Sequence, residues 1–142
     1  MRAGEPATKL RRVPAAVLAA AGIFLLASGC KSESADAGAV AAGMKAKMQL
    51  PARVDDDTRL DDVRALSKKE LGYFMTLTRM TKAQADATPL AKALETNLRG
   101  NACKDANYAK LFKAGIAIRV TYQGQDQAEV VSVVMRPADC GH

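Results

Sequence analysis

The chain has 142 residues, a formal net charge of +6 at pH 7, one histidine and no tryptophan. This length, less any signal, suffices for one small domain and excludes a multidomain protein. Aromatic residues make up only 4% of the chain, and no clustered lysine and arginine face is interleaved with them, which excludes a nucleic-acid-binding protein.

Residues 1–29 have the three parts of a secretory signal peptide, namely a basic head, an apolar stretch at 13–27 and a small-residue end. The apolar stretch is shorter than the roughly 20 residues that span a bilayer. Its end, Leu26–Cys30, resembles the lipobox of bacterial lipoproteins, with Ala27 where that family has an aliphatic residue. The resemblance implies cleavage before Cys30, a diacylglyceryl group on its sulfur and an acyl chain on the freed amine. The alternative is a plain signal peptide or a short uncleaved anchor, with Cys30 incidental.

The predicted location is the bacterial cell envelope, where the lipid on Cys30 would hold the protein in a membrane. Lys31 follows the cysteine where aspartate would imply retention in the inner membrane, so we expect the outer membrane, facing the periplasm. Removing residues 1–29 leaves 113 residues with 17 basic and 14 acidic side chains. Much of the basic charge therefore belongs to the signal.

Two further cysteines, Cys103 and Cys140, remain in the mature chain. Outside the cytoplasm such a pair predicts a disulfide. A redox or metal-binding pair would need the close C-x-x-C spacing, which the 37 positions between them do not provide.

The mature chain begins with a predicted flexible tether, residues 30–39, rich in serine, alanine and glycine, and continues as one domain, residues 40–142. Val40, Met44 and Met48 recur every fourth residue and predict a helix that ends before Pro51. Two interpretations of this apolar stripe are open: it packs on the core of the domain, or it belongs to a helix that lines a partner-binding groove.

An acidic cluster follows, formed by Asp55–Asp57, Asp61 and Asp62. It lacks the glycine and the glutamate of a calcium loop, so we expect a solvated acidic loop and no metal site. Thr58–Ser67 suits either a helix or a strand, and we favour a strand. Leu71–Met80 alternates in the manner of a strand and has apolar groups on both faces, which predicts a central position.

Two helices and a hairpin complete the chain. Thr88 as N-cap and Pro89 predict a helix that stops at Gly100. A second helix is expected after Cys103, capped by Asp105 and ended by Gly115, with its apolar side chains facing inward. Alternation predicts strands at 116–123 and 131–135, joined by a turn at Gly124–Gln127 and stopped by Pro137.

Together these elements predict an α+β domain with a small antiparallel sheet of about four strands, helices packed on one face, and one disulfide. The sequence offers little chemistry. His142 is the last residue, and no nucleophile elbow, phosphate-binding loop or zinc motif occurs. We therefore expect a protein that is not an enzyme and has no cofactor apart from its lipid.

The design resembles the pilotins of type II secretion, small disulfide-bearing α+β lipoproteins, and the resemblance implies an adaptor or assembly factor with an envelope or secretion-system partner. The alternative is a ligand-binding or enzyme-inhibitor module in the periplasm. An exposed apolar groove beside Val40, Met44 and Met48 would favour the adaptor. A closed pocket lined by Tyr73, Phe74 and Phe112 would favour ligand binding.

Overall fold

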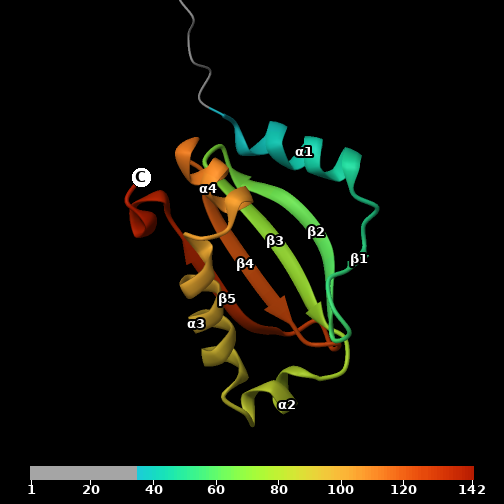
Figure 1. Ribbon diagram of the computed structural model, residues 1–142. Helices are drawn as coiled ribbons and strands as arrows, with labels where there is room; N and C mark the ends of the chain where they lie inside the picture. The colour runs from blue at the N-terminus through green and yellow to red at the C-terminus, as the bar shows by residue number, and fades with distance from the viewer. Residues whose placement is uncertain (1–34) are drawn as a thin grey trace, which may run out of the picture. The chain divides into compact units, whose positions relative to one another are not determined.

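A computed structural model describes residues 35–142, which belong to one compact unit. Cys30, the signal peptide and the first part of the tether lie outside the described residues. Helices and strands follow one another as shown in Figure 1. In chain order they are α1 (Ala37–Lys47), β1 (Ala52–Arg53), β2 (Thr58–Ser67), β3 (Glu70–Leu77), α2 (Lys82–Asp86), α3 (Leu90–Ala102), α4 (Ala106–Lys113), β4 (Ala117–Gln123), β5 (Glu129–Met135) and the 3₁₀ turn η1 (Pro137–Cys140).

The five strands form one sheet in the order β1-β2-β3-β4-β5. The α+β class is confirmed, as is the central position of β3. The sheet is mixed, however, because β3 and β4 run parallel while the other neighbours are antiparallel. The reason is the connection between them: α2, α3 and α4 carry the chain from the end of β3 back to its start, the crossover that a parallel pair requires. The two-residue strand β1 was not predicted.

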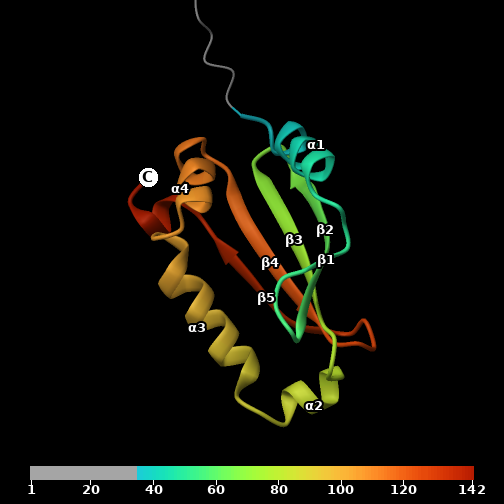
Figure 2. The ribbon, with the colours of Figure 1, turned by 45° about the vertical axis from the view of Figure 1, so that its right-hand side comes forward.

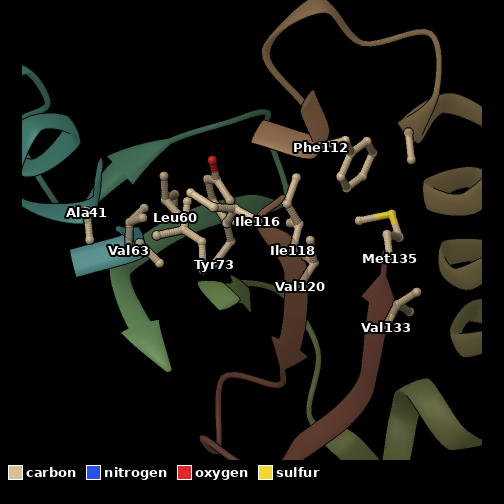
Figure 3. Close-up of a cluster of buried hydrophobic side chains, with 13 residues drawn as sticks. Ala41, Leu60, Val63, Tyr73, Phe112, Ile116, Ile118, Val120, Val133 and Met135 are labelled. Carbon is tan, nitrogen blue, oxygen red and sulfur yellow. The ribbon is translucent and has the colours of Figure 1, made fainter. Parts of the chain in front are cut away.

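One face of the sheet carries three apolar rows that cross the strands in register, and this face forms the core (Figure 3). Helix α1 packs over β2, α4 over β4 and α3 over β5, as Figures 1 and 2 show from two directions. Phe112 of α4 and Ala102 of α3 are buried in the same cluster as the rows. The rows are Leu60–Met75–Tyr122–Val131, Val63–Tyr73–Val120–Val133 and Ala65–Leu71–Ile118–Met135.

The opposite face of the sheet is polar and internally paired. Arg119 forms an ion pair with Glu70 at 2.7 Å. Thr76, although only 5% exposed, donates a hydrogen bond to Asp61 and accepts one from Gln123 at 3.0 Å. Asp61 thus lies inside a strand, which corrects its prediction as part of a solvated loop. A β-bulge between Leu60 and Asp62 accommodates Asp61, which has no partner residue in β3.

The acidic cluster is divided between two environments. Asp55, Asp56 and Asp57 are exposed in the loop before β2, as predicted. Asp62 is instead half-buried and bonded to Lys45 of α1 at 2.7 Å. Asp62 lies within β2, and the predicted strand Thr58–Ser67 is confirmed with both of its limits.

α1 and α4 agree with their predicted signals, whereas α3 begins at Leu90 with Pro89, and not Thr88, at its N-cap position. Asp36 caps α1, which begins at Ala37, within the stretch assigned to the tether. Asp105 caps α4, and Gly115 follows this helix with a φ of +73°, a conformation that favours glycine. Gly100 was predicted to stop α3, but the helix continues to Ala102, because Ala102 is buried in the core.

The two remaining cysteines are joined. Cys103, at the end of α3, forms a disulfide with Cys140 of η1, with a Cα–Cα distance of 5.3 Å. The bond ties the last turn of the chain to the junction of α3 and α4.

Candidate partner-binding groove

An open groove of about 350 Å³ lies between α1 and α4, above the central strand β3. Its lining is mostly apolar, with three polar side chains at the rim. The groove expected of an adaptor lay beside Val40, Met44 and Met48; Val40 and Met44 line this groove, whereas Met48 does not. The lining residues are Val40, Met44, Tyr73, Asp105, Asn107, Tyr108, Lys110 and Leu111.

The first wall of the groove is one side of α1. Ala37 and Ala41 are buried and let the helix approach β2 closely, because their side chains are small. Val40 and Met44, one turn apart, are half-buried: they pack against the core cluster and also line the groove. The predicted packing of this stripe on the core is confirmed for Val40, Met44 and Met48, and Val40 and Met44 also line the groove.

An ion pair fixes the position of α1 on the sheet. Lys45 lies 2.7 Å from the Asp62 carboxylate of β2. The hydrogen bond from Lys45 lowers the pKa of Asp62 below its usual value of 3.8, so the carboxylate is charged at neutral pH. The first turn of α1 is held as well, because the Ala37 N–H donates to the Lys68 carbonyl at 2.9 Å.

The second wall is α4. The Asp105 carboxylate accepts hydrogen bonds from the N–H groups of Asn107 and Tyr108 at 2.8 and 3.0 Å, which starts the helix. Phe112 then turns into the core, while Tyr108 and Leu111 remain half-exposed along the groove. The rim of this wall carries one negative group, Asp105, and one positive group, Lys110.

Tyr73 forms the floor and contacts both walls. Its hydroxyl lies 3.6 Å from Met44 Sδ, and its ring centroid lies 6.0 Å from that of Tyr108. Burial raises the pKa of Tyr73 strongly and that of Tyr108 to about 12. Both phenols therefore stay protonated at physiological pH and act as neutral hydrogen-bonding groups within an apolar surface. Such a surface has the composition typical of protein-binding surfaces, and neither phenol acts as an acid or base near pH 7.

The closed aromatic pocket that would favour a small ligand is not formed. Tyr73 and Phe74 are consecutive in β3 and point to opposite faces of the sheet. Phe74 lies on the polar face beneath Arg64, whose guanidinium carbon is 4.0 Å from the ring centroid. Phe112 is 1% exposed and packs in the core.

A larger hollow of about 550 Å³ lies between the β1–β2 loop and α3. Its acidic rim is already occupied by ion pairs within the chain, Arg53 with Asp56 at 2.6 Å and Arg79 with Asp57 at 3.1 Å. We therefore take the α1–α4 groove as the candidate binding surface, because its lining is more apolar and richer in tyrosine and methionine.

The described residues 35–142 contain no group of three or more histidine, cysteine or acidic side chains arranged to hold a metal ion. Within the same range, no helix has both the length and the apolar character that crossing a bilayer requires. The predicted lipid attachment residue, Cys30, lies outside this range, whereas Cys103 and Cys140 lie away from the groove in a separate hollow.

Comparison with known proteins relates the fold to three bacterial proteins of solved structure. No family model and no curated protein sequence matches the chain. Among solved structures, the pilotin EpsS of the Vibrio vulnificus type 2 secretion system superposes with a TM-score of 0.57 at 18% identity, over 75% of this chain and 89% of that one. The type II secretion pilotin AspS of Vibrio cholerae gives 0.54 at 14% identity, over 73% and 88%.

A third similar structure is a secreted protein of Pseudomonas aeruginosa, PA3611, described only as putative. It gives a TM-score of 0.58 at 12% identity and covers 72% of this chain and 87% of that one. At such low sequence identity, the superpositions establish a shared fold and nothing beyond it.

Proposed function

We propose that this chain, which shares its fold with two type II secretion pilotins, is a lipid-anchored, non-catalytic adaptor of the bacterial envelope. Its partner is a secretion-system protein of the outer membrane, and the α1–α4 groove binds a segment of that partner. The observation that carries the proposal is the groove itself, with Val40 and Met44 on one wall and Tyr108 and Leu111 on the other.

The lining defines the chemistry of the partner segment. An amphipathic helix presents apolar side chains one turn apart and polar ones beside them. Its apolar face would cover Met44, Tyr73 and Leu111, while its polar flanks would meet Asp105 and Lys110. Tyrosine and methionine are enriched where proteins bind one another, and tyrosine binds through both its ring and its hydroxyl.

The lipid anchor is part of the same proposal. It is supported by the lipobox-like Leu26–Cys30 and by the basic head and apolar stretch before it. An acylated Cys30 would keep the domain at the outer membrane, facing the periplasm, because two acyl chains already give stable anchoring. Mass spectrometry of the protein from its own cells tests this part: we expect Cys30 as the first residue, carrying lipid. A different N-terminus or a free thiol would contradict it.

Site-specific photocrosslinking in the native cells tests the groove. A photoreactive phenylalanine analogue at Leu111, in the groove, should crosslink one secretion-system protein. The matched control is the same substitution at Leu66, a leucine that is 41% exposed on β2 and absent from the groove lining. Equal crosslinking from both positions, or none from Leu111, would contradict the proposal.

A further inference from the structure

The point where the chain enters the folded domain lies beside a basic turn. Between β2 and β3, the Lys68 carbonyl accepts a hydrogen bond from the Ala37 N–H at 2.9 Å, and Lys69 Nζ donates to the Ala35 carbonyl at 3.2 Å. Both lysines are exposed. The turn therefore stays next to the first described residues of the chain.

A third lysine belongs to the same end of the molecule. The Lys69 carbonyl accepts a hydrogen bond from the Ala117 N–H at 2.8 Å, which places the start of β4 beside the turn. Lys113 ends α4 four residues before Ala117 and is exposed. Within residues 35–142, no carboxylate lies within salt-bridge distance of any of the three ammonium groups. We call Lys68, Lys69 and Lys113 the basic end.

The opposite end of the sheet carries both acidic and basic groups. The Asp57 carbonyl accepts the Thr78 N–H at 2.8 Å, just beyond the last residue of β3. Asp126, in the β4–β5 turn, accepts the Lys82 N–H at 3.1 Å at the same end. The two ends are separated by the eight residues of β3, about 26 Å at 3.3 Å per residue. Asp57 is itself paired with Arg79 at 3.1 Å, so that end carries charges of both signs. The described part of the chain begins at the other end, beside the unpaired lysines of the basic end (Figure 1).

We propose that the basic end contacts the anionic headgroups of the membrane to which Cys30 is tethered. Cys30 and Ala35 are five residues apart and can span at most about 17 Å. A lysine near a bilayer surface is attracted to anionic lipid, and the attraction acts within roughly 8 Å at physiological salt. The short tether and the three unpaired charges thus favour one orientation, with the basic end toward the bilayer and the other end of the sheet away from it.

This orientation rests on the lipid anchor of the proposed function. It determines how far the groove lies from the bilayer surface. α1 begins one residue after Asp36, and α4 ends beside the basic turn, so both walls of the groove start near the membrane-facing end. A partner segment would accordingly be bound close to the bilayer surface.

Vesicle sedimentation tests the contact with the mature chain carrying Cys30→Ser, which needs no lipid of its own. Residues 35–142 lie in one compact unit that contains the core cluster and the disulfide, so this form is expected to fold. We expect binding to phosphatidylglycerol vesicles at low salt and loss of binding near 1 M salt, where charges are screened beyond about 3 Å. Neutral phosphatidylcholine vesicles should not bind.

The decisive comparison uses two double variants with the same net charge. Lys68→Glu/Lys69→Glu should lower the partition onto phosphatidylglycerol about 10-fold or more. Lys47→Glu/Lys92→Glu changes two exposed lysines of α1 and α3 remote from the turn and should stay within about 2-fold of the parent chain. Equal loss in both variants, or no loss in the first, would overturn the inference. The anchor is tested separately by the mass of the native protein, so either part can fail alone.

Discussion

At the scale of single residues, the groove tyrosines link stability to alkaline pH. Burial raises the pKa of Tyr108 from 10.0 to about 12, so the folded protein holds this proton more tightly than the unfolded chain. The contribution of Tyr108 to the free energy of unfolding should therefore be constant below pH 10 and fall as the pH rises toward 12. Urea unfolding at a series of pH values measures this slope. Tyr108→Phe removes one titrating group and should make the slope shallower; an unchanged slope would argue against Tyr108 as its source.

A second residue-scale prediction concerns Thr76 on the polar face of the sheet. Its hydroxyl joins Asp61 to Gln123, and the residue is almost fully buried. Thr76→Val keeps the shape but leaves the carboxylate and the amide without this partner, which should cost about 1–3 kcal/mol of unfolding free energy. The matched control is Thr96→Val, on the exposed side of α3, where the hydroxyl bonds only to its own helix at 2.8 Å. A similar cost at both positions would contradict the role of the network.

At the scale of elements, the disulfide joins the junction of α3 and α4, within the helical crossover, to η1, just beyond the β4–β5 hairpin. Cys103 and Cys140 are 37 positions apart, and closing a loop of that length stabilises the fold by about 4 kcal/mol in the chain-entropy model. The Cys103→Ser/Cys140→Ser variant should lose that amount in urea unfolding without losing its helices. The parent protein treated with reductant is the control, since it should unfold at the same urea concentration as the double variant.

The elements also show what the sequence could and could not predict. Helix α4 and strand β4 follow from local signals, a cap at Asp105, a glycine stop at Gly115 and regular alternation after it. Helix α2 was missed, although Thr81 and Gln84 form a capping box that the sequence displays. The parallel pairing of β3 with β4 was missed because alternation gives the faces of a strand and not its neighbour or direction.

The groove could not be predicted from local sequence patterns, for a similar reason. Met44 and Leu111 line one surface although 67 positions separate them in the chain, and only the sheet between them brings their helices together. The sequence could identify the α1 stripe and name a groove as one outcome. It could not identify α4 as the second wall, because helical spacing showed the apolar side of α4 but not which of its residues the core would leave exposed.

At the scale of the whole molecule, the groove depends on how closely α1 approaches the sheet, and one alanine sets that distance. Ala41 is 5% exposed in the shared core, whereas its neighbour Ala42 is exposed to solvent. Ala41→Leu would force a larger side chain between α1 and β2, so we expect a loss of about 1–3 kcal/mol of unfolding free energy. The displaced helix would strain the Lys45–Asp62 ion pair and move Val40 and Met44 away from α4, and photocrosslinking from Leu111 should fall with it.

Ala42→Leu is the matched control for this coupling, because it adds the same atoms to the same helix on its outer side. Its unfolding free energy should change by no more than about 0.5 kcal/mol, and crosslinking from Leu111 should persist. If Ala41→Leu weakened the fold but left the crosslink intact, the groove would not depend on the seating of α1, and the partner would have to bind through α4 alone. If both variants lost the crosslink equally, the outer side of α1, and not the groove, would be the binding surface.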